Sequence, residues 1–190
     1  MTTSSVPVRA ATAADAEAIC DIYAPIVRET TISFEAEPPA PGEILRRMTA
    51  GPVRLPWLVA EMAQEVAGYA YAAAFRSRHA YRWSVETTVY IAASARRRGA
   101  GRALYLHLLG ELHALGYVSA FAGIALPNDA SVRLHETAGF TRIGMFPAAG
   151  YKHGRWVDVG WWGIELRRAP ALPDPPLPWA PDPRKPIMIA

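Results

Sequence analysis

The stretch that decides the fold is Ala-Arg-Arg-Arg-Gly-Ala-Gly-Arg at positions 95–102. Residues 85–92 before it alternate two sets of side chains, the first Val85, Thr87, Val89 and Ile91, the second Glu86, Thr88 and Tyr90. This period of two is typical of a strand. After it, Leu104, Leu108, Leu112 and Leu115 recur at helical spacing, with Tyr105 in the same apolar stripe. The segment therefore predicts a strand, a glycine-rich turn and a long helix.

The predicted turn has the properties of an anion site. Backbone N–H groups in the first turn of a helix have no internal partner, and the helix dipole places partial positive charge there. Gly99 and Gly101 allow a tight bend and a close approach of a phosphate to the backbone. Four arginines, Arg96, Arg97, Arg98 and Arg102, add guanidinium groups. The site is not a P-loop, because no Lys followed by Ser or Thr comes after the last glycine. A solvated arginine cluster is the alternative.

The rest of the chain predicts a mixed α/β sheet. Further strands are expected at 6–10, 57–62, 66–75, 117–124, 140–146 and 157–166, and further helices after a capping box at 12–15, at 42–50 and at 128–138. Residues 30–35 have extended character. Most neighbouring strands are expected to be antiparallel, with one crossover unit in the second half. We expect one domain at 1–168 and a proline-rich tail at 169–190, extended and docked through Trp179.

Composition narrows the class of protein. The chain has 190 residues, of which 51% are hydrophobic and 19% charged. Its longest apolar run, 66–75, is about half of what a bilayer crossing requires, and no signal peptide is visible. A single cysteine, Cys20, cannot form an intramolecular disulfide and is expected in the core rather than as a catalytic thiol. We therefore expect a cytoplasmic protein. The net charge of +3 is concentrated at the arginine turn, which favours a small anionic ligand over nucleic acid or a membrane.

The turn and its surroundings resemble a known family. The pattern Arg-x-x-Gly-x-Gly at 96–101, after a Val-Tyr-Ile strand, is similar to the acetyl-CoA signature of the GNAT acetyltransferase superfamily. Asn128 and the run 134–140 also match, so the resemblance covers about 85–146. It implies a mostly antiparallel twisted sheet whose splayed central strands are flanked by helices. It implies acetyl-CoA as co-substrate and no metal. The cofactor residues it implies are Val89, Tyr90, Ile91, Arg96, Arg97, Arg98, Gly99, Ala100, Gly101, Arg102 and Asn128.

Stretches outside the cofactor half narrow the resemblance to one subgroup. The segments 33–35, 56–61, 78–83, 85–90, 128–136 and 149–160 are similar to N-acetyltransferases of phosphinothricin, methionine sulfoximine and methionine sulfone. The implied reaction is acetyl transfer to the α-amino group of a small amino-acid analogue, by a homodimer. The implied substrate residues are Phe34, Glu35, Arg76, Arg78, His79, Ala80, Tyr81, Lys152 and His153. A solvated hairpin tip is the alternative for Lys152 and His153.

Two residues are candidates for proton transfer. Glu86 matches the subgroup's Glu and is the candidate general base, because a protonated amine is not a nucleophile until it loses a proton. Its alternative role is a structural carboxylate paired with Arg76 or Arg78, and a backbone carbonyl or water could share its task. His135 stands where many GNAT enzymes place a Tyr that protonates the leaving thiolate, and a His can donate a proton near neutral pH. Its alternative role is a helix residue with a hydrogen-bonded ring.

Two other functions remain open at this point. An acetyltransferase acting on a protein or peptide N-terminus would need an open groove, whereas the Arg76–Tyr81 connection and the segment 34–41 favour a closed pocket. A non-enzymatic CoA-binding module would keep the arginine turn but would have no need of Glu86.

Overall fold

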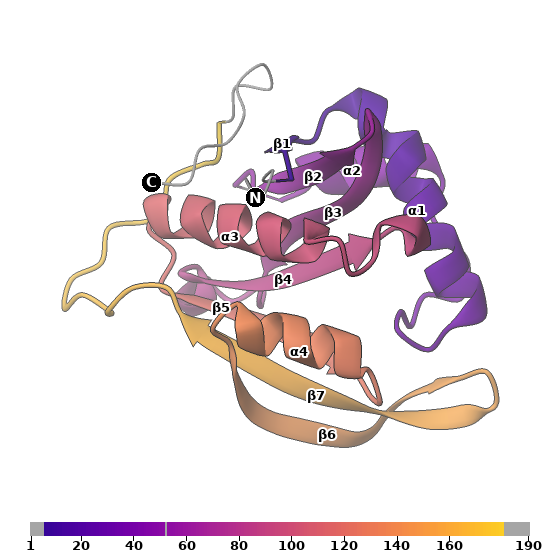
Figure 1. Cartoon of the computed structure of the whole chain (residues 1–190). Coiled ribbons are helices and arrows are strands. Elements are labelled where there is room, and N and C mark those ends of the chain that lie inside the picture. The colour runs from indigo at the N-terminus through magenta and orange to yellow at the C-terminus, as the bar shows by residue number, and fades with distance from the viewer. Residues whose placement is uncertain (1–5, 52, 181–190) are drawn as a thin grey trace, which may run out of the picture.

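The computed structural model describes residues 6–51 and 53–180, which form one seven-stranded sheet covered by helices (Figure 1). The spatial order is β1-β2-β3-β4-β5-β7-β6, and every neighbouring pair is antiparallel except the parallel pair β4–β5. The predicted mixed, mostly antiparallel sheet is therefore confirmed. The strands are β1 (Val8–Ala10), β2 (Trp57–Met62), β3 (Glu65–Ala74), β4 (Ser84–Ile91), β5 (Ser119–Ala125), β6 (Thr141–Lys152) and β7 (Arg155–Glu165).

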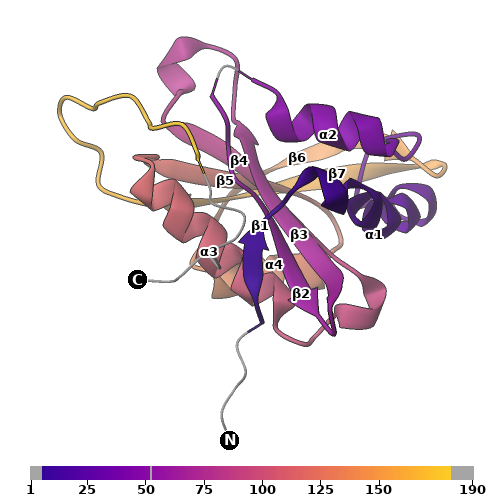
Figure 2. The same cartoon turned by 90° about the horizontal axis from the view of Figure 1, so that it is seen from above.

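Four α-helices cover the two faces of the sheet (Figure 2). One face carries α1 (Ala16–Glu29) and α2 (Pro41–Thr49), whose apolar side chains pack on Trp57, Val59 and Tyr69. The other carries α3 (Ala100–Ala114) and α4 (Asp129–Thr137), over a larger core that includes Leu58 and Val85. Three short 3-10 turns complete the described elements: η1 (Ala13–Asp15), η2 (His79–Tyr81) and η3 (Ala93–Ala95).

The parallel pair β4–β5 opens partway along its length. Only residues 84–86 of β4 pair with β5, at residues 119–121. Beyond Glu86 the two strands have no register partners, although β4 stays paired with β3 and β5 with β7 on their outer sides. The splay of the central strands is therefore present in this chain, and it leaves backbone groups of both strands free to bind a ligand between them.

The β6–β7 hairpin is longer than the sequence predicts. Its strands extend to a turn at His153 and Gly154, whereas the predicted strands end at 146 and begin at 157. β6 lies at the sheet edge with mostly exposed side chains and two register irregularities. It therefore shows no clear hydrophobic alternation. Residues 30–35, predicted as extended, form no strand.

The described part of the tail packs on the domain. Trp179 is 3% exposed and belongs to the larger core, and its Nε1–H donates to Glu111 Oε2 at 2.8 Å. The backbone amide of Leu177 donates to the Leu115 carbonyl. The docking predicted for Trp179 is thus observed, while residues 181–190 lie outside the described part. In the described ranges, no helix combines the length and apolar character that crossing a membrane demands.

Candidate active site

The arginine turn begins α3 as the sequence predicts. Gly99 caps the helix with φ of 90°, a left-handed conformation that favours glycine, and Arg97 also has a positive φ of 59°. The first helical bond runs from the Ala103 amide to the Gly99 carbonyl, so the amides of residues 100–102 have no acceptor within the helix. Arg96, Arg97, Arg98 and Arg102 are exposed, and none pairs with a carboxylate of the described residues. The turn fits a pyrophosphate.

The two glycines of the turn have different tasks. A Cβ on Gly99 would have only Val6 Cγ2 nearby, at 3.9 Å, so this position needs glycine for its backbone conformation. A Cβ on Gly101 would lie 3.0 Å from Leu134 Cδ2 of α4. The missing side chain of Gly101 therefore also lets α3 and α4 pack closely, and the approach of a phosphate to its backbone stays a prediction.

A cavity of about 580 Å³ lies where β4 and β5 separate. It is walled by α1, the 32–35 loop, β4, β5, α4 and the β6–β7 hairpin. Among the predicted site residues it brings together Phe34, Glu35, Glu86, Val89, Tyr90, Asn128 and His135. The sequence did not single out the other lining residues, which include Tyr23, Ser33, Thr88, Ser131, Phe146 and Trp161. Ile91 does not line this cavity but packs against the larger core and Gly68.

Glu86 faces this cavity without a partner. Among the described residues it forms no hydrogen bond and no ion pair, so the alternative of a structural pair with Arg76 or Arg78 is not observed. Burial raises the pKa of Glu86 above its ordinary value, and the positive charge of Arg76 opposes that shift. A partly desolvated, unpaired carboxylate is suited to accept a proton.

His135 is 4% exposed, and the protein engages each of its ring nitrogens. Nδ1 lies 2.7 Å from the Ser131 carbonyl oxygen, and Nε2 lies 2.5 Å from the hydroxyl of Tyr105. Burial lowers the pKa of His135, so the ring is held toward its neutral form. This geometry does not support the predicted direct proton transfer from His135 to a thiolate. Tyr105, expected as a core residue, is buried but also has this polar partner.

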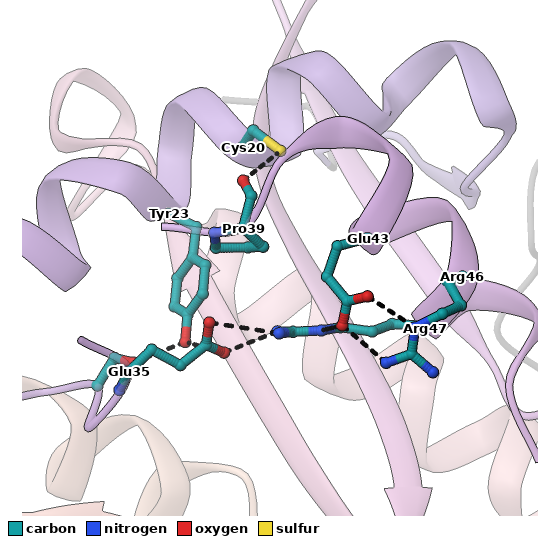
Figure 3. Close-up of polar contacts among 8 residues, drawn as sticks. Cys20, Tyr23, Glu35, Pro39, Glu43, Arg46 and Arg47 are labelled. Carbon is teal, nitrogen blue, oxygen red and sulfur yellow. Dashed lines mark hydrogen bonds and ion pairs between the residues drawn. The ribbon is translucent and has the colours of Figure 1, made fainter. Parts of the chain in front are cut away.

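The loop that walls the cavity is fixed by part-buried polar contacts (Figure 3). Glu35 accepts from Arg47 Nη1 at 2.7 Å and from the Tyr23 hydroxyl at 3.1 Å. Lys152 Nζ donates to the carbonyls of Val27 and Ser33, at 2.6 and 2.7 Å. The alternative of a solvated tip is therefore wrong for Lys152, which braces the loop of its own chain. His153 lies in the hairpin turn itself, with φ of 49°.

The Arg76–Tyr81 connection lies elsewhere than predicted. Its residues Arg76, Arg78, His79 and Tyr81 line a second cavity of about 720 Å³, together with Trp57, Tyr71 and Tyr117. Ala80, in η2, is exposed and lines neither cavity. The reason is that η2 folds the connection over the Ser84 end of β4, away from the splay. Arg76 alone approaches the first cavity: its Cζ lies 5.8 Å from the ring centroid of Trp161, which lines it.

The comparison with known families agrees with this geometry. The family model described as "Acetyltransferase (GNAT) domain" matches residues 8–161. The chain belongs to the GNAT acetyltransferases. In this GNAT chain the splayed strands, the glycine turn and the cavity-facing Glu86 lie in one molecule.

Individual relatives are similar over most of the chain. A phosphinothricin N-acetyltransferase of Streptomyces viridochromogenes is 48% identical over 93% of this chain and 94% of that protein. An L-methionine sulfoximine/L-methionine sulfone acetyltransferase of Salmonella typhimurium is 38% identical over 58% of this chain and 65% of its own. The crystal structure of a phosphinothricin acetyltransferase from Sinorhizobium meliloti, in complex with acetyl-CoA, has a TM-score of 0.83, 38% identity and coverage of 90% and 93%.

Proposed function

We propose that this enzyme transfers the acetyl group of acetyl-CoA to the α-amino group of a small amino-acid analogue such as phosphinothricin, methionine sulfoximine or methionine sulfone. The observation that carries the proposal is the 48% identity, over 93% of the chain, to a phosphinothricin N-acetyltransferase. The cavity at the splay supports it, because about 580 Å³ is within the range of small-molecule sites, roughly 300–1,000 Å³.

We assign the binding of acetyl-CoA to the glycine turn and the splayed strand β4. The free amides at the start of α3 and the arginines 96, 97, 98 and 102 hold the pyrophosphate. The unpaired edge of β4 at Val89 and Tyr90 binds the pantetheine arm as an added strand would, with Asn128 on its far side. Ile91 supports that strand from the core.

Glu86 acts as the general base in this scheme. Its carboxylate takes a proton from the acceptor's ammonium group, directly or through a water, and the free amine attacks the thioester carbonyl carbon. The carbon–sulfur bond then breaks, and the thiolate leaves with the electron pair and takes up a proton. Of the two carboxylates that line the cavity, Glu35 is already bound by Arg47 and Tyr23, whereas Glu86 has no partner among the described residues.

The acceptor's carboxylate is assigned to Arg76. This guanidinium stacks on Phe75, with Cζ 4.2 Å from the ring centroid, and approaches Trp161 in the cavity wall. Phe34 forms the opposite wall. We assign Arg78, His79 and Tyr81 a supporting role only, because they line the second cavity in this structure.

We also propose that the enzyme is a cytoplasmic homodimer. The β6–β7 hairpin exposes several large apolar side chains that a second copy could cover, namely Ile143, Met145, Phe146, Tyr151 and Trp156. The sole cysteine of the chain is a buried free thiol, which suits a reducing compartment.

The test of the proposed function is a thiol-release assay with acetyl-CoA and separate acceptors: phosphinothricin, methionine sulfoximine, methionine sulfone, ordinary amino acids and a peptide. We expect turnover of the analogues and none of the peptide. Acetylation of a peptide or protein N-terminus is the alternative function, and turnover of the peptide alone would establish it.

A further inference from the structure

The point where β4 and β5 separate is closed by a side chain. Glu86 and Phe121 form the last register pair of the two strands, and the Thr87 hydroxyl then donates to the Phe121 carbonyl at 3.2 Å. Thr87 is 3% exposed. A side-chain bond thus takes the place of the next backbone bond, so the strands can diverge without leaving this part-buried carbonyl unsatisfied.

Two further buried residues continue inward from Thr87. Tyr105 of α3 is fully buried and lies close to Thr87, but the two hydroxyls do not bond to each other, because the Thr87 proton goes to the Phe121 carbonyl. The Tyr105 hydroxyl lies 2.5 Å from His135 Nε2 on α4. The bond joins α3 to α4 beside Thr87 of β4, and each of these three elements carries other residues of the site.

The hydrogen bonds fix which nitrogen of His135 carries the proton. The Ser131 carbonyl can only accept, so Nδ1, 2.7 Å away, is the protonated nitrogen. In the neutral ring Nε2 therefore has a free lone pair, and the Tyr105 hydroxyl donates to it. Burial lowers the pKa of His135, which also favours the neutral ring. The groups around the ring are Tyr105 on α3, Phe140, and the Ser131 hydroxyl, whose oxygen lies 3.3 Å from Nδ1; the carboxylate of Glu136, the next residue of α4, accepts from Trp162.

We propose that Thr87, Tyr105 and His135 form a positioning network that keeps β4 and α4 apart at the width the reaction needs, with His135 as a hydrogen-bond acceptor rather than an acid. His135 is bonded to the first turn of α4, where Asn128 and Ser131 face the cavity. Thr87 is next to Glu86 on β4. The network therefore sets the distance between the base and the opposite wall. This inference rests on the proposed function, because its kinetic test needs an acceptor that the enzyme acetylates.

The kinetic test uses substitutions that remove one hydroxyl each. We expect Tyr105→Phe and Thr87→Val to lower kcat about tenfold to 100-fold, because small misplacements of reacting groups have effects of this size. Tyr117→Phe is the matched control, since Tyr117 is also buried in the same core but its hydroxyl has no side-chain hydrogen-bond partner among the described residues. We expect this variant to stay within twofold of the wild type. Unchanged kcat in Tyr105→Phe would overturn the proposal.

Substitutions of His135 distinguish its role as a hydrogen-bond acceptor from a role as a general acid. His135→Gln keeps an acceptor oxygen near the position of Nε2, so we expect it to retain most of the activity that His135→Ala loses. An acid role predicts instead that both variants lose at least 100-fold and that the alkaline limb of the pH–rate profile disappears in both. That result would overturn the proposal.

A spectroscopic measurement tests the network without any acceptor substrate. In the ¹⁵N spectrum of the wild-type protein between pH 6 and 8, we expect His135 to show a protonated Nδ1 and an unprotonated Nε2. In Tyr105→Phe the Nε2 resonance should shift, because its donor is gone. A protonated Nε2 in the wild type would contradict the proposal. If phosphinothricin and its analogues are not turned over, the proposed function fails, while this measurement still decides the network.

Discussion

Replacement of Glu86 by Gln tests the proposed chemistry most directly. Gln keeps the size of the side chain but cannot accept the amine proton. General base catalysis contributes about 10²–10⁴-fold, which corresponds to roughly 3–5 kcal/mol of the activation barrier. We expect kcat to fall by that factor in a thiol-release assay at pH 7, while acetyl-CoA binding measured by calorimetry is unchanged. The matched control is Glu65→Gln, an exposed carboxylate at the β2–β3 turn, which should be indistinguishable from the wild type.

The pH dependence follows from the direction of the pKa shift. Burial desolvates the Glu86 carboxyl and raises its pKa above its ordinary value. The wild-type rate should therefore fall as the pH decreases through that raised pKa, and Glu86→Gln should lose this acid limb. Wild-type rates in the variant across pH 6–9 would refute the role of Glu86 as base.

The free energy of unfolding provides an independent check on Glu86, because the raised pKa that suits a base makes the charged carboxylate unfavourable for folding. A carboxyl whose pKa rises on folding favours the folded state only while it is protonated, and this contribution is lost as the pH rises through the raised pKa. At neutral pH the charged Glu86 therefore does not stabilise the fold. We expect the Tm of Glu86→Gln at pH 7 to equal or exceed that of the wild type. A large decrease in Tm would mean that Glu86 has a structural partner.

The remaining predictions concern the donor turn, the cavity wall and the tail. Gly99→Val should weaken acetyl-CoA binding in calorimetry and cost about 1–2 kcal/mol of stability, because φ is 90° there. Its control, Gly110→Ala, lies in an open helical position and should instead stabilise the folded protein by about 0.5–1 kcal/mol. Gly150→Ala should displace Phe34, whose ring atoms lie 2.4 Å from the added Cβ, and raise the acceptor KM about tenfold with the acetyl-CoA KM unchanged. Trp179→Ala should reduce the unfolding free energy in denaturant titration by about 3–5 kcal/mol and leave kcat unaffected.

The donor half of the site was predictable because its determinants are local in sequence. A strand, two glycines and a run of arginines within 85–102 are enough to specify a turn with free amides. The alternation of Val85 and Glu86 also places the carboxylate on the correct face of β4, since faces alternate strictly along a strand. The local pattern could not predict the packing contact of Gly101 with Leu134, which belongs to a helix thirty-three positions further along.

The acceptor half was predicted less well because it is assembled from distant segments. Arg78, His79 and Tyr81 were assigned to the substrate by resemblance, but the 3-10 turn that carries them directs them to the second cavity. Lys152 looks like a solvated hairpin residue in sequence, and only the fold brings it to the carbonyls of Val27 and Ser33, more than a hundred positions away. No period or motif encodes such contacts.

The two carboxylates of the cavity show how position alone separates structural from chemical roles. Burial raises the pKa of Tyr23 to about 12, so its hydroxyl stays protonated and donates to Glu35 throughout the neutral range. With Arg47 as a second partner, Glu35 has its charge balanced and its lone pairs occupied. Glu86, desolvated and without such partners among the described residues, must obtain its stabilisation by taking a proton. The same residue type thus fixes a loop at one wall and is available as a base at the other.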